Sequence, residues 1–343
     1  MLKAYSFIIL MCFLTNAYAG ACETHTRRKV DLRNPLKTIC VYEPTTVGYT
    51  HDSDDVSFMD FTLSLRYQLF PYDLTKDLEK FQKGLGYNSA LYFSFTGRFA
   101  QYIGTRDSSP VIPKRFNPKL FFRHWLDNGD VSKGPHDPNH ITSSYLDVGY
   151  AHDSNGQAIH TNSQYDQAYS DAQKFNQNTD FVNDRISRGW DDVEFTYKRE
   201  RIISNFKIST FDNASADLSN YFQFRYFLRR GLLQGRAEDY DPTIHIDPQG
   251  KPRRRVDGVS EAIKGIITVR NNKTNKDTYY KYFISIDTGY SHFLSYKTYR
   301  LELSRKIWDL PLTIWYRSGY NSDLAQFYKK VDSYGINLDI GSF

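Results

Sequence analysis

Hydrophobic and polar residues alternate along several segments of this 343-residue chain. In residues 59–69 every odd position is apolar or aromatic and every even position is polar, and the same period of two recurs in residues 222–226, 299–303 and 310–317. Successive side chains of a β-strand point to opposite faces, so each segment predicts a strand with one apolar face. Strands of about 9–11 residues with such a face are long enough to cross a bilayer. The pattern predicts an all-β protein, a transmembrane antiparallel β-barrel.

The composition supports this fold class. Aromatic residues make up 16% of the chain, yet the mean hydropathy is −0.59, and no apolar run beyond the first residues reaches the length of a membrane-spanning helix. Abundant aromatic residues with low mean hydropathy are typical of barrels that have a polar lumen and aromatic girdles. A secreted soluble β-protein is the alternative. The net charge of +5 is too small to indicate a nucleic-acid partner, and we expect none.

The N-terminus has the order of a secretory signal peptide. A basic start is followed by an apolar stretch over residues 6–14 and by the small-x-small sequence of residues 17–19. We therefore expect residues 1–19 to be removed, residues 20–44 to form a periplasmic segment and residues 45–343 to form the barrel domain. Cys22 and Cys40 could form a disulfide in an oxidising periplasm, or both could be free. The chain ends in Phe343, as outer-membrane barrels commonly do.

The sequence Gly-Tyr-Ala-His-Asp-Ser-Asn-Gly at residues 149–156 carries candidate chemistry. His152 and Ser154 are two residues apart, so on a strand they share a face and could act as base and nucleophile. Gly156 could offer its backbone N–H to an oxyanion. The preceding residues on the same face are apolar: Leu146, Val148 and Tyr150. The pair is therefore predicted on the lipid-facing side, where polar groups are costly and usually functional.

A second segment repeats this arrangement. Residues 187–198 alternate in the same way, and Asp191 is the polar exception on their apolar side. Two adjacent antiparallel strands could bring Asp191 within reach of His152 and complete a Ser-His-Asp relay with Ser154.

These segments together resemble outer membrane phospholipase A. The resemblance rests on residues 149–156, 187–191, 108–110 and 117–121, and it extends in motif order and strand pattern from about residue 45 to residue 343. It implies a barrel of twelve strands in the outer membrane of a Gram-negative bacterium, with the active site towards the outer leaflet. It also implies calcium-dependent phospholipase A1 and A2 activity, hydrolysing sn-1 and sn-2 acyl esters of phospholipids and lysophospholipids, and a homodimer on activation.

The resemblance assigns roles residue by residue. Ser154 corresponds to the nucleophile, His152 to the general base and Gly156 to the oxyanion donor, while Asp191 stands where the family usually has an asparagine that orients the histidine. The implied Ca²⁺ ligands are the carbonyl of Gln157, the hydroxyl of Ser187 and, from the second subunit, the carbonyl of Ser108. Oxygen ligands of this kind suit a hard cation such as calcium.

Two departures from the family concern a loop and the dimer interface. Residues 157–186 replace a short family loop and are polar; we expect a solvated loop, although it could cover the site or add calcium ligands. The acidic candidates are Asp166, Asp171 and Asp180. Gly97 aligns with the glutamine that the family uses between subunits, so dimer formation would rest on apolar packing or on Gln101.

Other segments are expected to be structural. Residues 48–54 resemble part of the sequence of residues 149–156 and lie within the first predicted barrel strand, where we expect no second catalytic site. Residues 239–277 break the alternation and are expected to form a solvated periplasmic turn between strands eight and nine; residues 73–87 are expected to form a long turn, helical at 78–81. A porin-like barrel would have no reason to carry the relay residues on its apolar face. A secreted soluble lipase would be expected to show Gly-x-Ser-x-Gly between a strand and a helix.

Overall fold

The computed structural model describes residues 39–69, 89–104, 114–126, 141–177, 179–208, 211–228, 232–233, 261–271, 278–289, 293–308, 310–320, 324, 327 and 329–340. The predicted signal peptide, Cys22, the predicted turn at residues 73–87 and Phe343 lie outside these residues. So does Ser108, one of the predicted calcium ligands.

Almost all regular structure in the described residues is β-strand. The strands are β1 (Cys40–Val41), β2 (Thr46–Asp52), β3 (Ser57–Gln68), β4 (Ser89–Tyr102), β5 (Lys114–Trp125), β6 (Ile141–Ser154), β7 (Gly189–Ile208), β8 (Phe211–Phe227), β9 (Glu261–Asn271), β10 (Thr278–Thr288), β11 (Lys297–Ile307), β12 (Leu310–Gly319) and β13 (Val331–Asp339). Two helices, α3 (Asn162–Lys174) and α4 (Asp180–Asn183), lie between β6 and β7.

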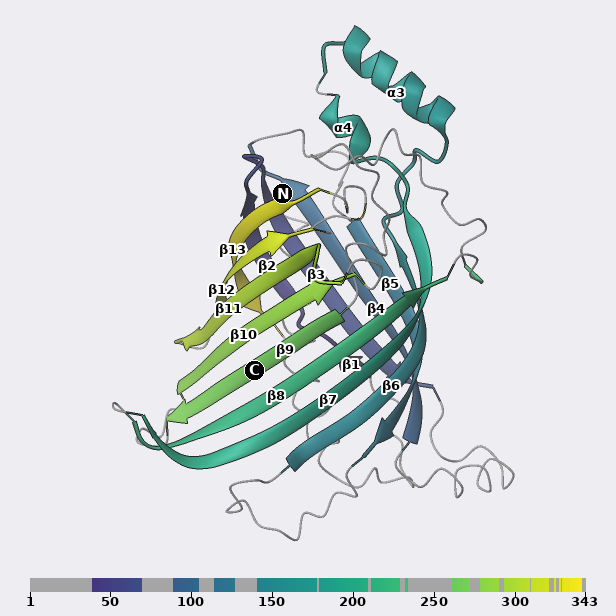
Figure 1. The fold of residues 1–343 in the computed structure, drawn as a ribbon. Helices are drawn as coiled ribbons and strands as arrows, with labels where there is room; N and C mark the ends of the chain where they lie inside the picture. Colours follow the sequence, from purple (N-terminus) through teal and green to yellow (C-terminus); the bar gives the residue numbers. More distant parts are fainter. Residues whose placement is uncertain are drawn as a thin grey trace, which may run out of the picture.

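Strands β2 to β13 form a ring of antiparallel neighbours (Figure 1). Each strand pairs with the next along the chain, and β13 pairs with β2, where Tyr334 lies opposite His51. The ring confirms the predicted twelve-stranded antiparallel barrel. The short strand β1 pairs with β3 beyond the end of β2, and its Cys40 is disulfide-bonded to a partner outside the described residues.

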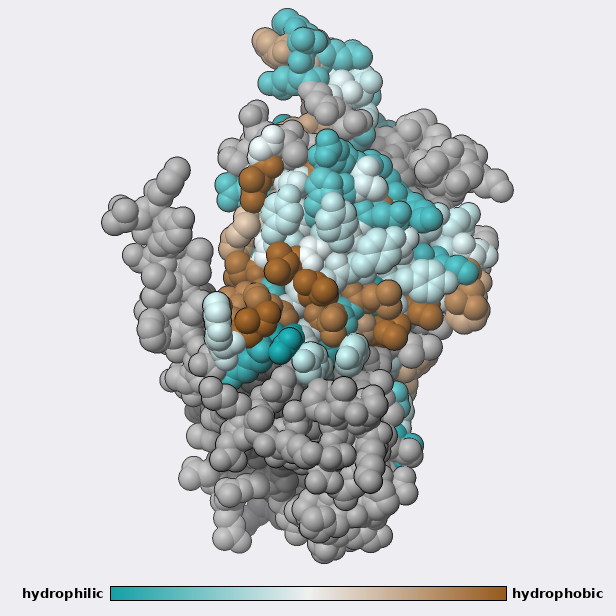
Figure 2. Space-filling model, turned by 90° about the vertical axis from the view of Figure 1, so that its left-hand side faces the viewer, coloured by the Kyte–Doolittle hydropathy of each residue, from teal (hydrophilic) through white to brown (hydrophobic). Residues whose placement is uncertain are grey.

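The two faces of the barrel wall differ in polarity, as the alternation predicts. Buried polar side chains line the interior, among them Asp60, Ser94, Lys119, Arg123, Asp147, Thr298, Ser304 and Asn337. Large exposed hydrophobic side chains lie on the outside, among them Phe93, Leu120, Val148, Phe195, Ile284, Leu301, Ile314 and Ile336. In Figure 2 hydrophobic residues form a band across one outer face, and hydrophilic residues lie above it towards the helices. None of the helices in the described part of the chain is long and apolar enough to cross a membrane.

Residues 157–186 form a helical excursion at one end of the barrel, rather than an irregular loop (Figure 1). The expectation that this segment is solvated is confirmed for α3, most of whose residues are exposed. Thr161 and Gln164 form a capping box that begins α3. The excursion has a small core of its own, made by Ile159, Ala172, Val182 and Ile186. Phe181 of α4 packs against a cluster on β3 and β4, and the Tyr102 hydroxyl of β4 donates a hydrogen bond of 3.2 Å to Asp184.

The prediction of a turn over residues 239–277 is also wrong for its second half. Residues 261–271 form β9, which pairs with β8 and β10. Their sequence contains four β-branched aliphatic residues, which favour strands, but Gly265-Ile266 interrupts the alternation of apolar and polar positions. The connection from β8 to β9 leaves the barrel at the same end as the connection from β6 to β7, because Phe227 at the end of β8 lies opposite Asp192 at the start of β7. This connection therefore starts at the end that carries the candidate site and joins the seventh and eighth strands of the ring, so the expected position between strands eight and nine at the opposite, periplasmic end is wrong.

Candidate active site

The candidate residues lie on two neighbouring strands, at the end of β6 and the start of β7. In the antiparallel register His152 lies directly opposite Asp191, and Ser154 lies directly opposite Gly189. Directly opposed residues of adjacent strands share a face of the sheet. The structure therefore gathers His152, Ser154 and Asp191 on the outer face of the wall, the face of Val148 and Val193.

His152 and Asp191 make a close polar contact. The distance between His152 Nδ1 and Asp191 Oδ1 is 2.6 Å. An ionised carboxylate can only accept hydrogen bonds, so we assign the imidazole proton to Nδ1 and leave Nε2 as the basic nitrogen. The Asp191 side chain is completely buried, and that of His152 is 19% exposed.

Gly189 leaves a small space between the base and the nucleophile. A Cβ atom built on Gly189 would lie 3.8 Å from His152 Nε2 and 3.7 Å from Ser154 Cβ. The basic nitrogen and the serine thus border the same space on the outer face. Proton transfer between a serine and a histidine requires this kind of proximity, and such contacts often tighten only when substrate is bound.

Asn155 fixes the chain on either side of this space. It is almost completely buried, and its Nδ2 group donates to the carbonyl of Ile186 at 2.8 Å. Its Oδ1 accepts from the backbone N–H of Arg188 at 2.8 Å, and its own N–H donates to the carbonyl of Arg188 at 3.0 Å. Sequence reasoning gave Asn155 no role, although its position between the candidate nucleophile and a glycine was the available signal.

Gly156 forms the turn after the candidate nucleophile. Its φ of +57° lies in the left-handed region that favours glycine, and a Cβ atom there would lie 3.2 Å from the Phe116 ring. Phe116 of β5 is in turn the cross-strand partner of Ser154. Its ring contacts those of Phe95 and Phe99, with centroid distances of 6.4 and 5.4 Å, so one side of the site is an aromatic wall.

The predicted dimer position lies beside this wall. Gly97 pairs with Phe116, and a Cβ atom on Gly97 would lie 3.1 Å from both the Phe95 and Phe99 rings. The glycine backbone is therefore covered by aromatic side chains, while Gln101, four residues along β4, is exposed.

Two of the predicted calcium ligands lie on facing segments. Gln157 is buried, and its N–H donates to Asn155 Oδ1 at 3.4 Å. Ser187 is half-buried, and its N–H donates to the carbonyl of Ile159 at 2.8 Å. Backbone carbonyl and hydroxyl oxygens on these segments are chemically suited to Ca²⁺.

The acidic residues that could add to this oxygen set lie in the helical excursion. Asp166 and Asp171 are exposed on α3, where Asp171 accepts a hydrogen bond of 3.0 Å from Gln167, and Asp180 begins α4. Within the described ranges no three His, Cys, Asp or Glu side chains gather as a metal site would require.

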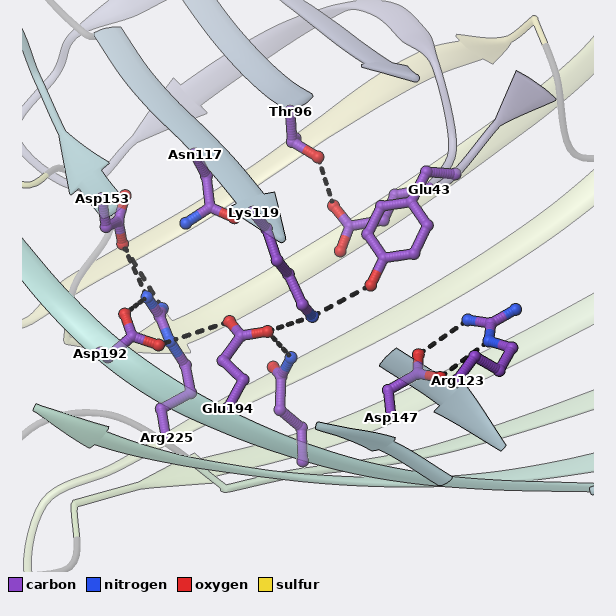
Figure 3. Close-up of polar contacts among 12 residues, drawn as sticks. Glu43, Thr96, Asn117, Lys119, Arg123, Asp147, Asp153, Asp192, Glu194 and Arg225 are labelled. Carbon is purple, nitrogen blue, oxygen red and sulfur yellow. Dashed lines mark hydrogen bonds and ion pairs between the residues drawn. The ribbon is translucent and has the colours of Figure 1, made fainter. Parts of the chain in front are cut away.

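Buried ion pairs lie in the lumen directly behind the site (Figure 3). Asp153, between His152 and Ser154 but pointing inward, accepts from Arg115 of β5 at 2.8 Å and contacts Arg225 of β8 at 3.4 Å. Arg225 also pairs with Asp192 of β7, with an Nε–Oδ1 distance of 3.1 Å. The two strands that carry the candidate relay are therefore tied to each other and to both outer neighbours by charged groups.

The lumen is occupied on both sides of these pairs. Lys119 pairs with Glu194, and its Nζ lies 3.1 Å from the hydroxyl of Tyr42, which follows β1. At the end with the site, Trp190 packs edge-on against Phe327, with 5.6 Å between ring centroids. Phe327 is almost completely buried.

Comparison with known proteins identifies the fold. No model of a protein family and no curated sequence matches the chain. Solved structures do: the outer membrane phospholipase dimer of Salmonella typhi with bound calcium has a TM-score of 0.50 and 16% identity, over 92% of this chain and 97% of that one. The chain has the fold of outer membrane phospholipase A.

A second phospholipase A structure agrees. An active-site mutant of outer membrane phospholipase A from Escherichia coli, in which an asparagine is replaced by alanine, has a TM-score of 0.51 and 16% identity, over 92% of this chain and 97% of that one. At this identity the likeness concerns the fold, so the chemistry has to be argued from the residues themselves.

Proposed function

We propose that this protein is a phospholipase of the outer membrane that hydrolyses sn-1 and sn-2 acyl esters of phospholipids and lysophospholipids, with Ser154 as nucleophile. One observation carries the proposal: Asp191 contacts His152 at 2.6 Å, and Ser154 shares the same outer face of the barrel. A porin-like or purely structural wall gains nothing from three polar groups at this position, because each is costly to expose to lipid.

The residues support a two-step acyl transfer. Ser154 Oγ attacks the ester carbonyl, and its proton passes to His152 Nε2 while Asp191 accepts from Nδ1–H and stabilises the imidazolium. The N–H of Gly156 is the proposed donor to the oxyanion. Collapse of the tetrahedral intermediate releases the alcohol, which takes its proton from His152. Water then attacks the acyl-enzyme, again losing its proton to His152, and Ser154 is restored as the fatty acid leaves.

The outer face suits a lipid substrate. Below the site the wall presents exposed apolar side chains, including Leu120, Val148, Val193 and Phe195. An acyl chain lying along this wall stays in an apolar environment while its ester reaches the polar residues at the strand ends. We place the site towards the outer leaflet.

Calcium and a second subunit belong to the proposal. The similar Salmonella typhi protein is a dimer with bound calcium. Here the carbonyl of Gln157 and the hydroxyl of Ser187, with the carbonyl of Ser108 from the second subunit, would hold Ca²⁺, which stabilises negative charge near the oxyanion when bound. The aromatic wall around Gly97, with Gln101, is the proposed contact between subunits.

Two other functions predict different measurements. An open pore would conduct ions in planar bilayers, and the buried pairs and the Trp190–Phe327 contact in the described lumen argue against one. A soluble lipase would remain in the aqueous fraction, whereas the barrel should co-sediment with membranes.

Active-site labelling tests the assignment of the nucleophile. A fluorophosphonate forms a stable bond with an activated serine, so mass spectrometry should find the adduct on Ser154 and lose it in Ser154→Ala. Labelling that persists in Ser154→Ala, or an adduct on another serine, would overturn the assignment.

A further inference from the structure

Asp191 is buried at a position where its neighbours on the strand are exposed. Val193 and Phe195 follow it on the same outer face of β7 and are 39% and 37% exposed, but Asp191 is 0% exposed. Other groups therefore cover this carboxylate on the side that faces away from the lumen.

The covering groups are three hydrogen-bond donors from distant parts of the chain. Asp191 Oδ2 accepts from the Tyr150 hydroxyl and from the N–H of Leu233 at 2.8 Å. The Tyr150 oxygen accepts in turn from the N–H of Leu232 at 2.6 Å. We call the Tyr150 hydroxyl and these two amides the Asp191 collar.

The end of β8 brings this part of the chain to the site. The N–H of Leu228, one residue beyond the strand, donates to the Asp191 carbonyl at 2.9 Å and extends the β7–β8 ladder. Leu232 and Leu233 then lie over the outer face with largely exposed side chains. Their apolar side chains face outward while their amides turn towards the carboxylate.

The collar matches a carboxylate rather than an amide. Both oxygens of an ionised Asp191 have donors, His152 at Oδ1 and the collar at Oδ2, and an anion in an apolar setting requires such compensation. An asparagine that kept its oxygen towards His152 would turn its NH₂ group towards the N–H of Leu233, so two donors would face each other. The collar thus accounts for an aspartate where the resembled family usually has asparagine.

We propose that Tyr150 is a positioning residue of the esterase site. With the amides of Leu232 and Leu233 it shields the Asp191 carboxylate from water, keeps it ionised and fixes its orientation. Asp191 then keeps the proton of His152 on Nδ1, which leaves Nε2 free to accept the proton of Ser154. This inference rests on the proposed function and deepens it.

A double-mutant cycle on the purified full-length protein tests the inference. Tyr150→Phe should lower kcat about tenfold with little change in KM, which corresponds to about 1.4 kcal/mol. It should also move the acidic limb of the rate profile to higher pH, because a carboxylate with one donor fewer holds the imidazolium more strongly. In the Asp191→Asn background the same substitution should change neither kcat nor the pH of the acidic limb.

The control is Tyr282→Phe, an exposed outer-face tyrosine on β10, which should leave kcat and the pH profile unchanged. Equal losses from Tyr150→Phe in both backgrounds would show a merely structural tyrosine and overturn the inference. Should Tyr150→Phe not fold, Leu233→Pro removes a collar donor outside the strands, and it should shift the limb in the same direction; an unmoved limb would equally overturn the inference. Hydrolysis that survives Ser154→Ala would instead overturn the proposed function, so the two failures are distinguishable.

Discussion

The carboxylate of Asp191 lies 2.6 Å from Nδ1 of His152, on the outer face of the barrel wall. Burial of that carboxylate makes the contact strong, because a charge-assisted hydrogen bond weakens when water competes for it. The same burial makes the carboxylate dependent on its other donors. Several consequences can be measured.

Replacing Asp191 by asparagine tests what the charge contributes. Asp191→Asn should retain at least about a tenth of the wild-type kcat, since an amide oxygen can still accept from Nδ1–H. The acidic limb of the rate profile should move to lower pH, because the imidazolium loses its counter-ion and the neutral base persists in more acidic solution. A pH–rate profile checks both. Almost complete loss of turnover in a folded barrel would contradict the prediction.

Replacing Asn155 tests the link between the nucleophile turn and the proposed calcium ligands. Asn155→Ala removes the side-chain bonds to Ile186 and Arg188, each costing about 1–3 kcal/mol when a buried partner is left unsatisfied. Because these bonds hold Gln157 and Ser187 on facing segments, more calcium should be needed for half-maximal activity. A calcium titration of fatty-acid release measures this. Asn162→Ala on exposed α3 is the control, and equal calcium requirements in the two variants would refute the link.

Arg225 tests the charged network behind the site. Arg225→Met leaves Asp153 and Asp192 in the lumen with a partner fewer, and removing one member of a buried ion pair typically costs about 3–5 kcal/mol. Denaturant unfolding in detergent should show a loss of this size. The control is Arg305→Met, an exposed residue of β11 that should cost less than about 1 kcal/mol. A loss for Arg225→Met no larger than that for the control would contradict a stabilising network.

The strands were predictable because the barrel imposes one rule on every strand. Because the wall has lipid outside and polar groups inside, apolar and polar residues alternate along each strand. His152, Ser154 and Asp191 stand out because they are polar residues at positions of the apolar face. β9 was not predicted because Gly265-Ile266 interrupts the alternation. The helices of residues 157–186 were not predicted because their apolar positions are few, although Thr161 and Gln164 were a visible capping signal.

The Asp191 collar could not be predicted from the sequence. Tyr150 and Leu232 are 82 residues apart, and the donors of Leu232 and Leu233 are backbone amides that carry no residue-type signature. Arg225, Asp153 and Asp192 are likewise ordinary inward polar positions until the register brings them together. Such contacts depend on the three-dimensional arrangement of strands rather than on any local pattern.

The central claim is tested most directly by fatty-acid release from phospholipid in detergent, with calcium and with chelator, by the wild-type protein and by Ser154→Ala. We predict calcium-dependent release by the wild type and none by Ser154→Ala, while both proteins show the heat-modifiable mobility of a folded barrel. Release by folded Ser154→Ala at the wild-type rate, or no release by the wild type with calcium, would contradict the account.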